Sequence, residues 1–440
     1  MKQKDAFMPA ASPVRRTRLV SWAPSGWFVR GNTVAIDTDF VTLCCPDEFV
    51  AVRAGFTNIH EEPYIINKVI AAASTTLSDG ANPTGNTVWT PLTFANGGAN
   101  AAEIVASADA PTRITVHGCR PDTPRGTTGI PRWTWTDWTP LASVARTDSS
   151  NAPRVLMLRV LLPAGCKHTR PNGGFLEYHA TPAMNLGFDY VAGHVPADIV
   201  TAPATIYAPA AGLGQSNPPV SCIQFLTRNA GIVGMTTGDS HHQGTSTTTQ
   251  FWNYLLRATV KIGAQHIGRI PFGYWSTARG GSGSEWFFSS LTNVLDVAKP
   301  SFVVLPGWTF NDMSGSVHAD QAANDAFLAR LLMTSEACVS NGAVPIFLTP
   351  FPRDAHSMNE EVVRPWLKLR RFILSMRDSG AIVVDATQLL GARSSSGEFD
   401  GCYLPQYTSD QVHPNDAGHA ALAKILGAEI EKLIDDSGTN

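Results

Sequence analysis

The sequence lacks several features that would each define a class of protein. Its 440 residues contain no run of about 18 uninterrupted apolar residues, so no membrane-spanning helix is expected. The 33 basic and 36 acidic residues leave a formal net charge of −3, with no excess of positive charge to neutralise phosphates. These absences argue against a membrane span and against nucleic acid as the main partner.

Cysteine is sparse and scattered along the chain. The seven cysteines are odd in number, too few for a disulfide scaffold, and none forms a Cys-x-x-Cys pair. A His-Glu-x-x-His motif is also missing, so a zinc site has no support in the sequence. We therefore expect mostly reduced thiols, no metal and no cofactor.

The first 20 residues show no secretory signal. They contain lysines, arginines and an aspartate and lack the apolar stretch of about 7 to 15 residues that such a signal needs. With no signal peptide visible, we expect a cytoplasmic protein or one exported by another route. The oligomeric state is left open by the sequence.

The first part of the chain, residues 1–200, is expected to form an all-β sandwich. Short apolar or β-branched runs, such as 40–43, 114–116 and 155–162, are separated by clusters of turn residues. Residues 201–220 are rich in proline, alanine and glycine and carry no charge, which predicts a linker.

Tryptophans gather in one segment of this first part. Trp133 and Trp135 stand at alternating positions, where they would share one face of a strand. Their flat rings could stack on sugar rings, although core packing is the commoner explanation for such a pair. Both interpretations stay open at this point.

Residues 221–440 show a different pattern, in which buried strands alternate with helices. The expected strands are the apolar runs 231–235, 302–305, 344–348 and 382–384. The expected helices are 250–260, 285–298, 320–340, 360–379 and 415–434. Such alternation predicts a three-layer α/β domain whose functional groups lie beyond the carboxyl ends of the strands.

One motif places a serine where it could act as a nucleophile. Gly238-Asp239-Ser240 follows the apolar run 231–235 and precedes a helical pattern, so Ser240 falls at a strand-to-helix turn. Backbone N–H groups at such a turn can stabilise a developing oxyanion. Asp239 is expected to support the turn through hydrogen bonds.

A second motif offers the base that a serine nucleophile needs. Asp410 and His413, followed by a proline, precede the last helix of the chain. Their spacing lets the Asp410 carboxylate meet one ring nitrogen of His413 while the other nitrogen faces Ser240. The sequence therefore predicts Ser240, His413 and Asp410 as catalytic residues.

With these motifs the sequence resembles the SGNH (GDSL-type) hydrolase family. Four blocks occur in the order typical of that family: Gly238-Asp239-Ser240, a glycine block at Gly281, Gly307-Trp-Thr-Phe-Asn311-Asp312, and Asp410-x-x-His413-Pro414. The resemblance covers roughly residues 223–434. It implies an α/β/α domain with a flavodoxin-like parallel sheet over 221–440, preceded by the β-sandwich as an accessory domain.

The resemblance also implies an oxyanion hole formed by the N–H groups of Ser240 and Gly281 and the amide of Asn311. This chain departs from the family pattern in its third block, which has three residues instead of one before Asn311. Asn324 competes with Asn311, although it lies within a helical pattern. Three other glycines compete with Gly281: Gly273, Gly280 and Gly283.

A further departure lies directly after the nucleophile. His241 stands where the older family motif has leucine or isoleucine. We expect His241, Trp308 and Phe310 to contact the substrate, with core packing as the alternative for the two aromatic residues. A metal held by His241 and His242 is not expected, because adjacent side chains rarely face one site.

The activity that the resemblance implies is hydrolysis of acyl esters by a serine esterase. Acetyl esters of carbohydrates are favoured, since family members with an added β domain are often carbohydrate esterases. The expected partner is therefore an acylated small molecule or glycan. Three alternatives remain: a lipase or thioesterase for longer acyl chains, acyl transfer to a sugar hydroxyl, and a non-catalytic glycan-binding or structural protein.

Overall fold

The structure, a computed structural model, describes most of the C-terminal half of the chain and separate stretches of the N-terminal half. The described residues are 14–23, 27–29, 37–44, 49–59, 62–74, 87–95, 111–117, 132–140, 155–171, 190–195, 198, 200–201, 219–248, 252–266, 269–312, 321–354, 357–358 and 360–436. Internal contacts divide the chain into two compact units.

The first unit, here called the α/β unit, comprises Met1–Arg16, Ile232–Ile262 and Tyr274–Asn440. The second, the β unit, comprises Thr17–Gly231 and Gly263–Gly273. The chain passes from one to the other within strand β14 (Val220–Thr236). The linker expected at 201–220 stays a prediction, because residues 202–218 lie outside the described residues.

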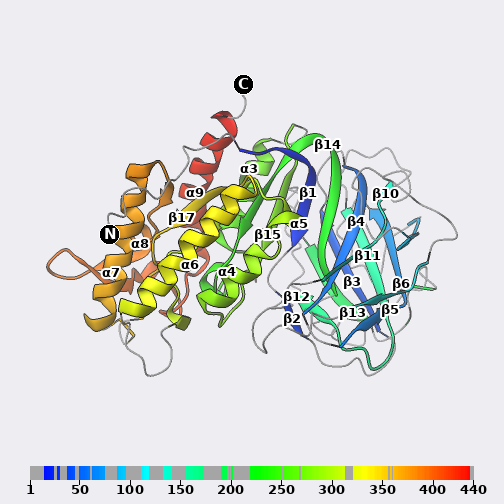
Figure 1. The fold of residues 1–440 in the computed structure, drawn as a ribbon, viewed down its shortest axis with the longest axis horizontal. Coiled ribbons are helices and arrows are strands. Elements are labelled where there is room, and N and C mark those ends of the chain that lie inside the picture. The colour runs from blue at the N-terminus through cyan, green and yellow to red at the C-terminus, as the bar shows by residue number, and fades with distance from the viewer. Residues whose placement is uncertain are drawn as a thin grey trace. The chain divides into compact units, whose positions relative to one another are not determined.

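A parallel sheet forms the centre of the α/β unit (Figure 1). Its strands are β14, β15 (Phe272–Ser276), β16 (Phe302–Leu305), β17 (Val344–Leu348) and β18 (Ile382–Val384). The spatial order is β15-β14-β16-β17-β18, and β14, β16, β17 and β18 pair in parallel. Numbered along the chain, this order is 2-1-3-4-5, which is the flavodoxin-like order.

Helices lie on both faces of this sheet. In Figure 1, α4 and α6 lie in front of the strands and α9 lies behind them. The helices of this unit are α2 (Ser240–Gln243), α3 (Tyr254–Gln265), α4 (Ser284–Thr292), α5 (Leu295–Ala298), α6 (Gln321–Ser340), α7 (Glu360–Ser375), α8 (Ala386–Leu390) and α9 (Asp416–Asp436). Short 3-10 helices are η2 (Phe310–Asp312), η3 (Met376–Ser379) and η4 (Pro405–Tyr407), and β19 (Gly391–Arg393) pairs with β20 (Phe399–Tyr403).

The pattern of apolar residues explains both the sheet and the helices that cover it. The strands β16 and β18 consist of apolar residues, as expected where helices cover both faces of a parallel sheet. In α7 the buried residues Val362, Trp366, Leu369 and Ile373 recur at spacings of three and four, which gives the helix one apolar face. The predicted three-layer α/β/α fold is confirmed.

The β unit consists mostly of strands in several sheets. Its strands are β1 (Thr17–Ala23), β2 (Trp27–Val29), β3 (Asp37–Cys44), β4 (Phe49–Asn58), β5 (Tyr64–Ile66), β6 (Lys68–Ser74), β7 (Thr90–Leu92), β8 (Ile114–Val116), β9 (Arg132–Trp135), β10 (Thr139–Pro140), β11 (Val155–Leu162), β12 (Thr169–Pro171) and β13 (Tyr190–Val195). A five-stranded sheet has the order β13-β3-β11-β6-β7, and all four pairs of neighbouring strands are antiparallel. The predicted β architecture is confirmed for this part of the chain.

Trp133 and Trp135 do share one strand, and their rings stack on each other at 5.2 Å between centroids. Trp135 is buried, and so is Trp138. The buried guanidinium of Arg53 lies over both rings, 4.3 Å from Trp135 and 4.7 Å from Trp138. This arrangement supports core packing for Trp135 and Trp138.

Candidate active site

The predicted nucleophile begins a short helix at the carboxyl end of β14. Ser240 is the first residue of α2, so no helical carbonyl accepts its backbone N–H. Gly238, two residues earlier, has a φ of 137°. A Cβ atom at Gly238 would lie 2.4 Å from Cγ of His242, so a larger residue would clash there. The sharp turn that presents Ser240 therefore depends on this glycine.

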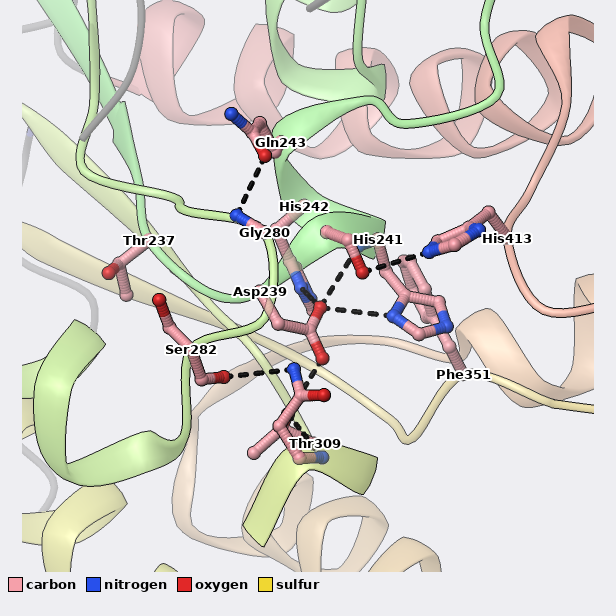
Figure 2. Close-up of polar contacts among 12 residues, drawn as sticks. Thr237, Asp239, His241, His242, Gln243, Gly280, Ser282, Thr309, Phe351 and His413 are labelled. Atoms are coloured by element: carbon pink, nitrogen blue, oxygen red, sulfur yellow. Dashed lines mark hydrogen bonds and ion pairs between the residues drawn. The ribbon is translucent and has the colours of Figure 1, made fainter. Parts of the chain in front are cut away.

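The buried carboxylate of Asp239 stabilises the same turn through hydrogen bonds (Figure 2). Its buried Oδ1 accepts from the backbone N–H of His241 at 3.0 Å, and it lies 3.0 Å from Nδ1 of His241 and 3.2 Å from Nδ1 of His242. Its Oδ2 accepts from the Thr309 hydroxyl at 2.7 Å. Burial alone would raise the pKa of Asp239, but the two imidazoles outweigh it and hold that pKa well below its ordinary value. Asp239 is therefore an ionised acceptor.

The structure brings the three residues predicted as catalytic into one hydrogen-bonded line. Nε2 of His413 lies 2.9 Å from Oγ of Ser240, across 173 residues of sequence. Nδ1 of His413 lies 2.7 Å from Oδ2 of Asp410. Both distances are those of hydrogen bonds, and the order of groups is that of a nucleophile, its base and the base's orienting carboxylate.

The loop that carries His413 is held by the Asp410 carboxylate. Oδ1 of Asp410 accepts from the backbone N–H groups of Val412 at 2.9 Å and His413 at 2.7 Å, and Oδ2 accepts from the Ser246 hydroxyl at 2.7 Å. Burial would raise the pKa of Asp410, but these hydrogen bonds, led by those of His413, lower it. Asp410 therefore stays ionised near neutral pH.

The surroundings of His413 favour its neutral form. Burial lowers its pKa most, the neighbouring His241 lowers it further, and the Asp410 carboxylate only partly restores it. The rings of His241 and His413 lie 5.2 Å apart between centroids. A neutral imidazole with Nδ1–H donated to Asp410 leaves Nε2 as the acceptor for the Ser240 hydroxyl proton.

The predicted third block lies beside the turn of Ser240. Asn311 belongs to η2, and its Nδ2 donates to the backbone carbonyl of Ser282 at 3.0 Å. Asp312 accepts from the backbone N–H of Ser284 at 2.8 Å and so caps α4, which is the bracing role that suits its position. The competing Asn324 lies inside α6.

Of the competing glycines, Gly280 is the one that the structure places against the nucleophile. A Cβ atom on Gly280 would lie 3.8 Å from Cβ of Ser240, and its N–H donates to the buried Gln243 side chain at 2.7 Å (Figure 2). Gly281, the predicted donor, is exposed, has a φ of 74°, and a Cβ atom on it would meet nothing within 4 Å. The oxyanion role of Gly281 stays a prediction.

A small cavity lies next to these residues. Its lining includes the three residues predicted to contact the substrate, His241, Trp308 and Phe310. The other lining residues are Asp239, His242, Thr309, Phe351, Pro352 and Arg353. The guanidinium carbon of Arg353 lies 3.9 Å from the centre of the Phe310 ring. Nε1 of Trp366 in α7 donates to the carbonyl of Phe351 at 3.1 Å and so fixes that wall.

Sequence reasoning missed Phe351, Arg353, Gln243 and Ser246. Phe351 and Arg353 follow β17, and residues at the carboxyl end of a parallel strand could have been suspected from position alone. Gln243 and Ser246 carry no comparable signal, because their partners are far away in the sequence.

The described part of the chain contains neither a cluster of metal ligands nor a helix suited to span a membrane. No group of three or more His, Cys, Asp or Glu side chains within it is arranged to hold a metal ion. None of the helices it contains combines the length and the apolar character needed to cross a bilayer.

Comparison with known proteins points in the same direction as the geometry. The family model described as GDSL-like Lipase/Acylhydrolase matches residues 223–426. No curated protein matches the chain.

Three solved structures illustrate what the chain is similar to. A GDSL-like lipase from Bacteroides thetaiotaomicron is 17% identical, with a TM-score of 0.35, over 46% of this chain and 87% of that one. A family 3 carbohydrate esterase from Clostridium thermocellum is 14% identical, with a TM-score of 0.34, over 47% of this chain and 98% of that one. An acetyl xylan esterase from Geobacillus stearothermophilus is 17% identical, with a TM-score of 0.33, over 46% and 95%. Values this low carry no information on substrate.

Proposed function

We propose that this chain, whose residues 223–426 form a domain of the GDSL-like lipase/acylhydrolase family, is a serine esterase that works through an acyl-enzyme on Ser240. The observation that carries the proposal is the pair of hydrogen-bond distances at His413, 2.9 Å to the Ser240 hydroxyl and 2.7 Å to the Asp410 carboxylate. A serine placed only for structure needs neither an imidazole nor a carboxylate behind it.

In the first half of the reaction, Nε2 of His413 takes the proton of Ser240 while the Ser240 oxygen attacks the ester carbonyl. Asp410 holds the imidazole with its proton on Nδ1 and stabilises the imidazolium that forms. When the tetrahedral intermediate collapses, the bond to the leaving alcohol breaks and His413 returns the proton to that alcohol. Water then repeats the same steps on the acyl-enzyme and releases the acid.

The oxyanion of each intermediate would be bound by the N–H groups of Ser240 and Gly281 and by the amide of Asn311. Nδ2 of Asn311 donates to the Ser282 carbonyl at 3.0 Å, and this hydrogen bond orients the side chain.

For the substrate we propose an acetyl ester of a carbohydrate. The support is the resemblance to esterases with an added β domain. Hydrolysis of longer acyl esters is the competing outcome of the test below.

The test uses a fluorophosphonate probe, which reacts only with an activated serine, and a series of p-nitrophenyl esters. We expect labelling and turnover in the wild type and neither in Ser240→Ala. Ser375→Ala, which removes an exposed serine of α7, is the matched control and should behave as the wild type. A wild-type protein that the probe fails to label would end the esterase proposal. A sharp preference for acetate supports an acetyl ester as the substrate. Activity that rises with chain length up to about eight carbons indicates a lipase for longer acyl esters instead.

A further inference from the structure

The cavity beside the nucleophile contains buried polar atoms that have no partner. Nε2 of His241, Nε2 of His242 and Nε1 of Trp308 are all buried and make no hydrogen bond within the described part of the chain. The three residues are only 5%, 2% and 6% exposed, respectively, and all three line the cavity. Leaving a buried polar atom without a partner is unfavourable, so such a group calls for an explanation.

The network around Asp239 determines what these atoms can do. Because Asp239 is ionised and only accepts, Nδ1 of both His241 and His242 must carry the proton that faces it. In a neutral imidazole the other nitrogen, Nε2, then has a lone pair and no proton. The indole Nε1–H of Trp308 can only donate. The cavity therefore presents imidazole Nε2 atoms, which accept when the ring is neutral and donate when it is protonated, together with the indole donor of Trp308.

A hydroxyl group complements this arrangement. It donates one proton, to an imidazole Nε2, and accepts from an N–H such as that of Trp308. The cavity of about 10 Å³ is close to the smallest space that holds one water-sized group. An anion fits less well, because the ionised Asp239 adds a negative charge to the lining. Nε of Arg353, which also lines the cavity, lies 3.4 Å from the Asp354 carboxylate but makes no hydrogen bond in the described part of the chain, so it is a second donor for a hydroxyl oxygen.

The position of His241 indicates which part of the substrate would supply the hydroxyl. Its ring lies 5.2 Å from that of His413, the group that would return a proton to the leaving alcohol. A side chain that lines the cavity and stands against this imidazole is on the leaving-group side of the reaction. A hydroxyl on the alcohol, a few bonds from the ester oxygen, could reach the cavity when the ester is bound.

We propose that this cavity is a hydroxyl-binding subsite, in which His241 and Trp308 select esters whose alcohol carries a second, free hydroxyl, as polyols and sugars do. The inference rests on the proposed esterase function and adds a specificity determinant to it. A site built to bind a hydroxyl discriminates strongly against an analogue without it, because its own polar groups are then left unpaired.

The experiment compares two esters of nearly equal size, 2-hydroxyethyl acetate and propyl acetate, which differ by a hydroxyl in place of a methyl group. We expect kcat/KM of the wild type to favour the hydroxylated ester by about 10²-fold or more. A second pair, ethyl glycolate and ethyl propionate, moves the same difference to the acyl side and should show no such preference.

Two variants assign the preference to the cavity. Trp308→Phe removes the indole donor and keeps the aromatic ring, while His241→Asn keeps a donor for Asp239 and removes Nε2. Each should lower the ratio of kcat/KM between the two acetates by about tenfold or more. His241→Gln, which can restore an acceptor near Nε2, should recover part of the ratio. Trp252→Phe, outside the cavity lining, is the control and should keep it.

The outcomes separate this inference from the esterase proposal. Equal kcat/KM values for the two acetates, in a wild type that the fluorophosphonate probe labels at Ser240, overturn the hydroxyl subsite and leave the esterase standing. A preference that appears only in the glycolate pair overturns the assignment to the alcohol. Absence of labelling together with absence of turnover overturns the esterase proposal and this inference with it.

Discussion

The two loops that bring Ser240 and His413 together are built in opposite ways. The nucleophile turn, residues 237–243, is buried except for the half-buried Ser240. Asp239 accepts hydrogen bonds there from two imidazoles, a backbone N–H and the Thr309 hydroxyl. The closing loop, residues 408–413, is more open: the Asp410 side chain is 41% exposed and that of His413 is 17% exposed. Here one carboxylate accepts from two backbone N–H groups, from His413 and from Ser246.

The difference separates two tasks. A buried carboxylate that loses its partners destabilises the fold, whereas a partly exposed one is screened by water and contributes less to stability. We therefore expect the nucleophile turn to govern stability as well as activity, and the closing loop to govern chemistry alone.

The largest effect is expected at the closing loop. Asp410→Asn keeps the shape of the side chain but can turn an N–H toward Nδ1 of His413, which favours the wrong tautomer. We expect kcat to fall by about 10⁴, with little change in melting temperature. Ser246→Ala, which removes one donor to Asp410 and leaves the carboxylate in place, is the control and should lose no more than about tenfold. A marked loss of stability in Asp410→Asn would contradict the expectation that the closing loop governs chemistry alone.

A smaller loss is expected when the predicted oxyanion donor is removed. Asn311→Ala should lower kcat by about 10² to 10³ and leave KM nearly unchanged, because the amide acts on charge that develops only in the transition state. Thermal unfolding should show whether loss of the bond to Ser282, at 3.0 Å, weakens the fold. Wild-type turnover in this variant would remove Asn311 from the mechanism.

A substitution in the buried nucleophile turn should lower the free energy of unfolding. Asp239→Asn replaces an acceptor that serves several donors, and we expect the free energy of unfolding to fall by about 3 kcal/mol, measured by urea denaturation. The pKa of Asp239 is lower in the folded chain than its unfolded value of about 3.9, so its contribution is fully present above about pH 4 and is lost as the pH falls further. The gap between variant and wild type should therefore narrow in acid.

The control for this variant is Asp296→Asn, which changes an exposed carboxylate on α5. Its free energy of unfolding should stay within about 0.5 kcal/mol of the wild type. Equal stability of Asp239→Asn and the wild type at neutral pH would contradict the role given to the turn.

The smallest effect concerns pH. Burial and the neighbouring His241 lower the pKa of His413, so the acidic limb of the kcat/KM profile should have its midpoint below the ordinary imidazole value of about 6.5. His241→Asn removes one cause and should move the midpoint upward by less than about one unit. A histidine away from the site provides the control, His266→Asn, which should leave the midpoint in place. A midpoint above 6.5 in the wild type would reverse the interpretation.

Much of the fold could be predicted because its signals are local. The apolar runs 302–305, 344–348 and 382–384 coincide with β16, β17 and β18. Strand β15 was missed because Gly273 interrupts it, and a glycine inside an apolar run resembles a turn. The structure explains this glycine: a Cβ atom there would lie 2.5 Å from the carbonyl oxygen of Ser21. Such a close approach of a distant segment leaves no periodic signal.

The candidate site divides in the same way. Ser240, His413 and Asp410 could be proposed because each lies in a short motif at the end of a recognisable element. Gly280 could not be preferred over Gly281 for contact with Ser240, since adjacent glycines differ only in what the folded chain places beside them.

The amino-acid sequence alone determined which segments become strands and helices and which residue types could carry the chemistry, because periodicity and turn residues act over a few positions. Only the tertiary structure decided which groups meet. It brings Ser240 against His413 across 173 residues, and it turns Nδ1 of His241 toward Asp239 so that Nε2 is left for another partner. The physical reason is that hydrogen bonds between distant residues depend on how whole layers pack, and no short stretch of sequence encodes that packing.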